Sequence, residues 1–284
     1  MPGSTTLYVW TVPSYFAHSP VDHTWVTTYD NRANVYQTDA DVAAAGQFYW
    51  YCWGKFHSAG GTPANPTGFL GSQGGDLALA QCLVLANADS RTTPAARGTI
   101  FVYGVDGVCH QLANQVLYAT NAGGPKPLTV HLARGYMAST FIYGTYGLQH
   151  SAWASKTASC SGARLAPGGS GGAMMAAGAG GPGGPDDFEA RAREILGPSD
   201  PKLLDLMRLR SDVHQFAGRA WPGAGQPSAE ALNARNQHML DEAAKLLGPE
   251  HFKSIFGFSP GEKIDLVDKE INDSAGQIPP PKPR

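Results

Sequence analysis

The chain has 284 residues, of which 42% are hydrophobic and 15% are charged, and its formal net charge is −2. This composition, with 35 glycines, is typical of a folded globular protein with one large domain or two smaller ones. Neither half of the chain has a basic cluster dense enough to bind a phosphate backbone, so we expect no nucleic-acid partner.

The N-terminus and the cysteines bear on the compartment. Residues 1–10 lack the basic start and apolar core of a secretory signal, and no apolar run approaches the roughly 18 residues of a membrane span. We therefore expect a cytoplasmic protein without a membrane partner; export that reads no N-terminal signal is also compatible. The cysteines form neither a Cys-x-x-Cys pair nor zinc-type Cys/His spacing, so we expect no metal, no cofactor and no disulfide framework. They are Cys52, Cys82, Cys109 and Cys160.

The charged residues divide the chain into two parts. Residues 1–166 contain no Glu, seven Asp and eight Lys or Arg, whereas residues 167–284 hold seven Glu, nine Asp and thirteen Lys or Arg. Residues 167–185 are almost wholly Gly, Ala, Pro, Ser and Met, which bury too little apolar area to offset chain entropy. We predict an α+β domain over 1–166, a flexible linker over 167–185, a helical domain over 186–275 and a proline-rich tail over 276–284.

Most predicted elements of the first part are strands. Runs of β-branched and aromatic residues predict strands over 7–12, 23–29, 48–53, 99–103, 128–132 and 140–146. Alternation places His23 and Trp25 on one face of the second strand. We expect a short helix over 39–48, capped by Asp39 or Asp41, and a buried helix over 76–87. The Gly- and Pro-rich residues 58–75 predict a long loop.

Beyond residue 185 the apolar residues recur with the helical period of 3.6. Asp186 or Asp187 is a predicted cap for the first helix, Asp200 with Pro201 starts the second, and Ser228 starts the third. The helices are predicted over 188–196, 202–217, 228–247 and 250–256, with a frayed one over 265–271. This part of the chain therefore predicts a small helical bundle.

Cys109 is the strongest candidate functional residue. It lies in the stretch Tyr103-Gly-Val-Asp-Gly-Val-Cys-His-Gln-Leu-Ala113, where a Gly-containing turn leads into an apolar stripe at helical spacing. Cys109 is thus predicted at a helix N-terminus, where unpaired N–H groups and the helix dipole favour a thiolate. The alternative is an unreactive cysteine buried in the core.

A thiolate nucleophile needs an imidazole partner. His23 is the first choice because a histidine on a strand is held rigidly. His131, on the predicted strand 128–132, is the second choice. His110 follows Cys109 on the helix and points about 100° away from it, so we expect that it does not reach the sulfur.

Two motifs suggest a family. Gly-Val-Cys109-His-Gln-Leu-Ala resembles the cysteine helix of papain-like folds, notably of transglutaminase-like and NlpC-type peptidases. His23-Thr-Trp-Val-Thr-Thr-Tyr-Asp resembles the histidine strand of the transglutaminase-like group and of the circularly permuted group that includes NlpC-type and lecithin:retinol-acyltransferase-like enzymes. The histidine precedes the cysteine here, as in the permuted group. The resemblance covers about residues 5–150 and implies a papain-like α+β fold, with an antiparallel sheet and a cysteine-bearing helix.

The resemblance also implies catalytic roles. Cys109 would be the nucleophile and His23 the base, while an orienting residue would lie on the strand after the histidine, at the distance of Gln37 or Asp39. The open alternatives for that residue are Asp30, Asn31, Tyr36, Gln37 and Asp39. The Cys109 N–H and a polar side chain, Tyr103 or Gln111, would form an oxyanion hole.

These observations favour a thiol-dependent hydrolase or acyltransferase, such as a cysteine peptidase or amidase, that acts on an amide or ester bond through a Cys–His dyad. A peptide or peptidoglycan-like substrate is what the resemblance implies. The alternative is a non-enzymatic protein in which an aromatic-rich domain binds a ligand and the C-terminal helices bind a protein partner. A third possibility makes the helical domain an inhibitory segment or a pro-segment removed at the linker.

Overall fold

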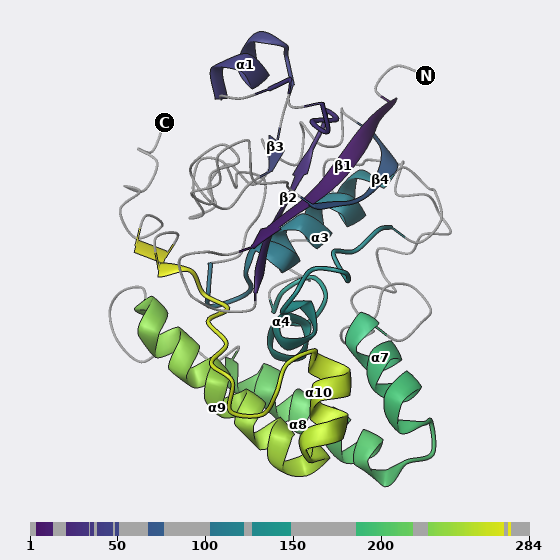
Figure 1. Ribbon diagram of the computed structural model, residues 1–284, viewed down its shortest axis with the longest axis vertical. Coiled ribbons are helices and arrows are strands. Elements are labelled where there is room, and N and C mark those ends of the chain that lie inside the picture. Colours follow the sequence, from purple (N-terminus) through teal and green to yellow (C-terminus); the bar gives the residue numbers. More distant parts are fainter. Residues whose placement is uncertain are drawn as a thin grey trace.

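The computed structural model describes residues 4–13, 21–33, 35–36, 39–47, 49–50, 68–76, 103–121, 127–148, 186–217, 227–269 and 272–273. The predicted helix 76–87, most of the predicted strand 99–103, the linker 167–185 and the tail 276–284 lie outside these residues. The described part mixes helices with one antiparallel sheet, which confirms the α+β class. Strands gather at one end of the molecule and the C-terminal helices at the other (Figure 1).

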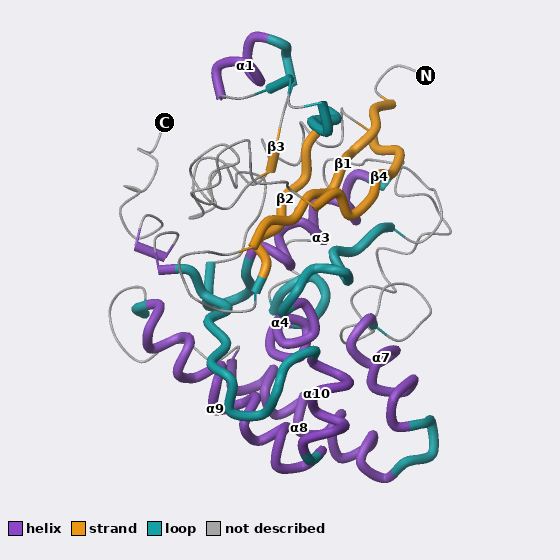
Figure 2. Tube along the Cα trace, viewed as in Figure 1, coloured by secondary structure: helices purple, strands orange, loops and turns teal. Residues whose placement is uncertain are grey.

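The sheet has the strand order β3-β2-β1-β4. Its strands are β1 (Ser4–Pro13), β2 (Asp22–Thr27), β3 (Tyr49–Trp50) and β4 (Gly68–Asp76). The strands predicted over 7–12 and 23–29 are confirmed in position, and the one predicted over 48–53 is confirmed at Tyr49 and Trp50, the part that the structure describes. Helix α1 (Asp39–Ala44) precedes β3 and confirms the helix predicted to start at Asp39. Figure 2 shows the strands side by side in one layer.

Strand β4 corrects the second half of the long loop predicted over 58–75, whereas residues 58–67 lie outside the described residues. Four of its nine residues are glycines, which usually weaken a strand, but β4 pairs with β1 along almost its whole length. That pairing supplies the backbone hydrogen bonds that side-chain propensity does not predict. A Cβ atom on Gly75 would lie 2.9 Å from the Leu7 side chain and 3.6 Å from the Thr120 carbonyl oxygen, so glycine allows close packing there.

The two faces of the sheet carry different residues. Trp10 pairs with Trp25, and Val12 pairs with His23, so the His23 and Trp25 side chains project from the same face as Trp10. On the opposite face, Gln73 pairs with Leu7, and its Nε2 donates to the Leu117 carbonyl oxygen at 2.7 Å. Leu117 belongs to α3 (Cys109–Thr120). Helix α3 therefore covers the face of the sheet that carries Leu7.

Helix α4 (Tyr136–Tyr143) replaces the strand predicted over 140–146. Its residues are β-branched or aromatic at several positions, but nearly all of them are buried, because α4 lies between α3 and the C-terminal helices (Figure 1). A helix buried on every side shows no apolar stripe, so the sequence carries no helical period there. Gly135 and Gly144, both with φ of 76°, bound the helix.

The strand predicted over 128–132 is also wrong. Residues 127–130 belong to no strand, and residues 131–135 form turns that lead into α4. The backbone pairs with side chains instead of with a neighbouring strand. The Leu128 N–H donates to Gln73 Oε1 at 2.9 Å, and the Val130 N–H donates to Asn114 Oδ1 at 3.0 Å. These bonds give the backbone N–H groups of the segment their acceptors without making the segment part of a sheet.

The C-terminal helices agree closely with the prediction. They are α7 (Asp187–Leu196), α8 (Pro201–Ala217), α9 (Ala229–Leu247) and α10 (Pro249–Phe256). Asp186 caps α7 by accepting from the Glu189 N–H, and Ser228 caps α9 by accepting from the Ala231 N–H. The frayed helix predicted over 265–271 is not borne out at its start, because residues 262–266 lack helical structure.

The C-terminal helices share a core with α4. Phe141 of α4 contacts Phe188 and Phe256, with ring centroids 5.2 and 5.5 Å apart. Arg210 of α8 donates to the Thr140 carbonyl oxygen at 2.8 Å. Buried apolar residues from both parts of the chain form one cluster that runs from the sheet through α3 and α4 into α7–α10. The change in composition near residue 167 is therefore not matched by a break in the core.

Candidate functional site

Cys109 is the first residue of α3, as predicted. Val108 precedes it in an extended conformation, with φ of −127° and ψ of −169°, and its N–H donates to Gln111 Oε1 at 3.1 Å. The Gln111 amide also donates to Ser139 Oγ and to the Gly144 carbonyl oxygen, at 3.2 and 3.0 Å. Gln111, one of the two predicted oxyanion donors, thus fixes the start of α3 against α4.

The loop before Cys109 is a tight, buried turn. The Gly104 N–H donates to the Gly107 carbonyl oxygen at 2.8 Å, and Gly104 has φ of 76°, which favours glycine. The Asp106 carbonyl oxygen accepts from the Leu148 N–H at 2.8 Å. Tyr103, the other predicted oxyanion donor, is buried, and its hydroxyl accepts from the Asp268 N–H at 3.0 Å. The turn holds Cys109 at a defined place.

The Cys109 sulfur lies against strand β2. Sγ is 3.9 Å from the Asp22 carbonyl oxygen, which is a long and weak contact for a thiol donor. That oxygen belongs to the peptide bond that joins Asp22 to His23. The helix N-terminus and the histidine strand, 87 residues apart in the chain, therefore meet at this peptide.

The imidazole of His110 reaches the same oxygen as the Cys109 thiol. His110 Nε2 lies 2.9 Å from the Asp22 carbonyl oxygen, and Nδ1 lies 2.8 Å from Ser139 Oγ. Because a carbonyl oxygen only accepts, Nε2 carries a proton. The Cys109 sulfur and His110 Nε2 thus share one acceptor oxygen, at 3.9 and 2.9 Å. The expectation that His110 does not reach the sulfur stays a prediction.

His110 belongs to a row of polar residues that is visible in the sequence of α3. Next to the apolar stripe of α3 stand His110, Gln111, Asn114 and Gln115, and each of them is completely buried. A polar face on a helix is normally solvated, so these residues read as an exposed surface. Their amide groups instead donate to backbone carbonyl oxygens of residues 144–146, beyond α4.

His23 is buried on β2, and its ring stacks on that of Trp25 with the centroids 6.2 Å apart. Its side chain projects from the face that carries Trp10 and Trp25, whereas α3 covers the other face. The structure therefore brings the His23 backbone next to Cys109 and directs the imidazole along the Trp25 side of the sheet. The catalytic pairing of Cys109 with His23 stays a prediction.

The structure describes four of the five predicted orienting residues, namely Asp30, Asn31, Tyr36 and Asp39. Asp39 begins α1, which Figure 1 shows beyond the sheet at the end opposite to the C-terminal helices. Gln37 lies outside the described residues. Asp30 pairs with Arg32, whose guanidinium holds the pKa of that carboxyl below its usual value. Asn31 is bonded to the backbone N–H and carbonyl of Tyr36. No orienting residue is thereby assigned.

His131 lies in the turn before α4 and is exposed. Its Nδ1 is 3.3 Å from the Thr129 carbonyl oxygen and 3.4 Å from Thr129 Oγ1. These contacts stay within its own loop, and they do not bring His131 to Cys109. Its use as the second-choice base stays a prediction.

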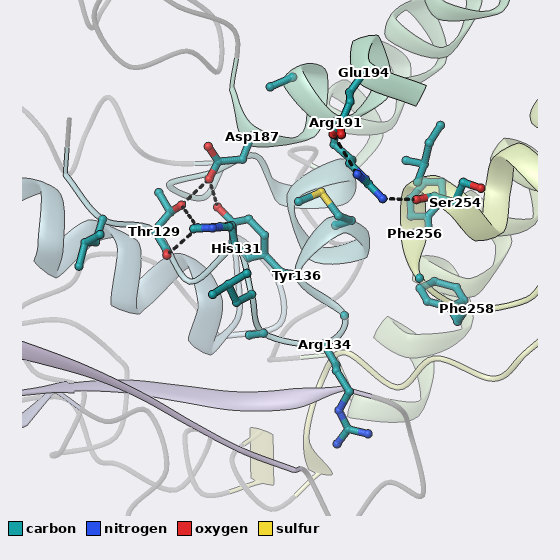
Figure 3. Close-up of a pocket in the computed structure, with 18 of the residues that line it drawn as sticks. Thr129, His131, Arg134, Tyr136, Asp187, Arg191, Glu194, Ser254, Phe256 and Phe258 are labelled. Atoms are coloured by element: carbon teal, nitrogen blue, oxygen red, sulfur yellow. Dashed lines mark hydrogen bonds and ion pairs between the residues drawn. The ribbon is translucent and has the colours of Figure 1, made fainter. Parts of the chain in front are cut away.

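His131 borders a cavity of about 790 Å³ between the turn before α4 and helices α7 and α10 (Figure 3). Asp187 stands on one wall, where its Oδ2 accepts from Tyr136 Oη at 2.9 Å and from Thr129 Oγ1 at 2.5 Å. Burial raises the pKa of Tyr136 well above its usual value, and the Asp187 carboxylate adds to the shift. Tyr136 therefore remains a neutral donor over the physiological range.

Arg134 connects this cavity to the Cys109 site. Its Nε donates to Asp22 Oδ1 at 2.8 Å, and its backbone N–H donates to Asp22 Oδ2 at 3.0 Å. In return the Asp22 N–H donates to the Arg134 carbonyl oxygen at 3.0 Å. Asp22 is thus held by three bonds to one residue, which fixes the carbonyl that Cys109 and His110 share.

Comparison with known proteins gave no match: no family model, no curated protein and no solved structure resembles the chain significantly. Among the described residues, no three or more His, Cys, Asp or Glu side chains cluster as metal ligands would. No helix in the described ranges has the length and apolar character needed to cross a membrane.

Proposed function

We propose that this protein is a thiol-dependent hydrolase or acyltransferase of papain-like type, with Cys109 as its nucleophile and an amide or ester of a peptide or peptidoglycan-like molecule as its substrate. One observation carries the proposal. The helix N-terminus that bears Cys109 meets the strand that bears His23 at the Asp22–His23 peptide, with an imidazole on the neighbouring residue. The backbones of two motifs that are distant in sequence thus meet at one peptide bond.

The position of Cys109 suits acyl transfer. A thiolate at the first residue of a helix is favoured by the dipole and by backbone N–H groups of the first turn. It would attack the substrate carbonyl carbon, and those N–H groups would stabilise the resulting oxyanion. Collapse forms a thioester and releases the amine or alcohol, which takes a proton from an imidazolium. Water or a second acceptor then cleaves the thioester and returns a proton to the imidazole.

Two imidazoles compete for the role of base. The family resemblance assigns it to His23, whose backbone adjoins the sulfur contact. The geometry offers His110, whose Nε2 already shares the Asp22 carbonyl oxygen with Cys109. His110 would need to exchange that carbonyl for the sulfur, whereas His23 would need to turn from the Trp25 face. The first change is confined to one side chain, whereas the second also requires the backbone of β2 to change, because the backbone sets the face on which a strand side chain lies.

A second candidate function is favoured by the burial of the thiol. Cys109 is only 4% exposed, which is typical of a core cysteine, and the cavity beside α7 is lined by both apolar and charged side chains. In that case the protein binds a ligand and does not catalyse a reaction. Cys109 would then react no faster than an ordinary buried thiol.

The test measures the reactivity of Cys109 directly. The full chain is treated with iodoacetamide across pH 5–9, and alkylation of the Cys109 peptide is followed by mass spectrometry, with free cysteine as the reference. We expect Cys109 to react faster than free cysteine at about pH 6, where an ordinary thiol is almost wholly protonated. A rate below that of free cysteine at every pH would support the ligand-binding alternative.

The base is identified with p-nitrophenyl acetate as a probe ester. Acylation is read as a mass increase on the Cys109 peptide in the wild type, with Cys109→Ala as the blank. His23→Gln and His110→Gln are compared under the same conditions, because glutamine keeps a polar side chain of similar reach. A decrease of about 10²-fold or more in the acylation rate of one variant identifies the replaced histidine as the base, since general bases contribute at least that factor. Equal rates in both variants and the wild type would exclude imidazole assistance.

A further inference from the structure

We propose that helix α9 and the segment 264–268 position the loop that presents Cys109, and that Tyr143 is the positioning residue through which α9 acts. This inference rests on the proposed function and extends it, because it gives the C-terminal helices a part in the reaction. They would be neither a removable pro-segment nor an independent partner module. The contacts that support it are made by Tyr103 and Gly104, the first residues of the loop.

The Gly104 carbonyl oxygen is held by two donors. Tyr143 Oη of α4 donates to it at 2.9 Å, and Arg235 Nη2 of α9 lies 3.3 Å from it. The Tyr143 hydroxyl accepts in turn from Asn236 Nδ2 at 2.9 Å and from Arg235 Nη2 at 3.1 Å. One hydroxyl thus joins the Cys109 loop to two consecutive residues of α9.

This cluster is buried in the core, since Tyr143 is 1% exposed and Asn236 is completely buried. Burial raises the pKa of Tyr143, so its hydroxyl keeps the proton that it donates to Gly104. A buried polar group costs about 1–3 kcal/mol when its partner is missing, so the cluster tolerates few alternative arrangements. Its directional bonds hold the loop in one orientation, which apolar packing alone would not specify.

The segment 264–268 supports the loop from another side. The Asp268 N–H donates to Tyr103 Oη at 3.0 Å. A Cβ atom on Gly104 would lie 2.8 Å from side-chain atoms of both Leu232 and Val267, so α9 and this segment pack directly on the glycine. Asn233 of α9 fixes the segment by bonding both the N–H and the carbonyl of Val267, at 2.9 and 2.8 Å.

The loop is stiff enough to transmit this support to the thiol. Between Gly104 and Cys109 the chain forms one closed turn, through the Gly104 N–H to Gly107 carbonyl bond, and then enters α3. A displacement of Gly104 therefore moves Cys109 relative to the Asp22 carbonyl. Misplacement of a reacting group by about 1 Å can lower a rate by about 10²-fold.

The experiment compares two buried hydroxyl groups of the same helix. Tyr143→Phe removes the hydroxyl that contacts the Cys109 loop. Thr140→Val is the control, because it removes a buried hydroxyl that donates to the Tyr136 and Met137 carbonyl oxygens of α4 and leaves the loop contacts intact. Both variants are made in the full chain, and their free energies of unfolding are measured. The pH profile of Cys109 alkylation and the kcat and KM for p-nitrophenyl acetate are then compared.

We expect both variants to lose similar stability, but only Tyr143→Phe to lower kcat, by about ten- to a hundredfold with KM nearly unchanged, and to alter the alkylation profile. Asn233→Ala, at a less buried position, releases Val267 and should lower kcat in the same direction if Tyr143→Phe does not fold. Equal kinetics in Tyr143→Phe and Thr140→Val, with a reactive wild-type thiol, would overturn this inference alone. An unreactive wild-type Cys109 would overturn the proposed function and this inference together.

Discussion

Replacement of Arg210 by methionine should destabilise the whole protein, because Arg210 joins three elements in the core. Its guanidinium pairs with Asp186 at the start of α7, donates to the Thr140 carbonyl oxygen of α4 and lies over the Phe188 ring, with Cζ 4.9 Å from the centroid. The side chains of Arg210 and Asp186 are only 6% and 2% exposed. Methionine keeps much of the volume and removes every polar contact.

The expected loss follows from the charge that is left behind. Breaking a buried ion pair by removing one partner costs about 3–5 kcal/mol, because the remaining charge is uncompensated. The Thr140 carbonyl oxygen also loses this donor. Such a loss is a large part of the roughly 5–15 kcal/mol that stabilises an ordinary domain. Asp186→Asn retains the side-chain oxygen that caps α7 and removes the charge, so the double variant should recover part of the loss.

The assay is denaturation in guanidinium chloride, followed by tryptophan fluorescence for the sheet and by far-UV circular dichroism for the helices. We expect the two signals to shift together to lower denaturant concentration in Arg210→Met, since both parts of the chain share one core. A loss below about 1 kcal/mol would refute the account of the ion pair. An early helical transition with an unchanged fluorescence transition would refute the shared core.

Two further predictions concern pH and the linker. Burial raises the pKa of Tyr136, Tyr143 and Tyr146 above 10, so the folded state retains their protons after the unfolded state has lost them. The contribution of these tyrosines to stability should be constant up to about pH 9 and fall above about pH 10, by up to about 1.4 kcal/mol per pH unit for each tyrosine. Tyrosinate absorbance that accounts for all eleven tyrosines before the chain unfolds would contradict this. A chain cut at a protease site inserted within residues 167–185 should elute as one complex in gel filtration, because the buried contacts of α4 with α7 and α8 remain. Separate elution of the two fragments would show that the C-terminal helices form an independent unit.

The sequence alone predicted the elements whose boundaries are set by local chemistry. Asp186 and Ser228 are side-chain caps, and Pro201 occupies the first helical position, so the starts of α7, α8 and α9 could be placed from neighbouring residues. The turn before Cys109 and the stripe after it placed the thiol at the start of α3 for the same reason. Alternation and β-branched residues located β1 and β2.

Tertiary structure alone decided the elements that depend on distant partners. Helix α4 is buried at every residue but Met137 and shows no helical period of apolar residues, and β4 is a strand because β1 pairs with its glycines. The polar face of α3 became a buried network because α4 and the turn after it supply the acceptors. His110 came to share the Asp22 carbonyl with Cys109 through packing of the start of α3 against the start of β2. The sequence motifs made Cys109 a candidate nucleophile because they place it at a helix N-terminus. The surroundings of its sulfur depend on contacts with distant residues, which no local sequence pattern encodes.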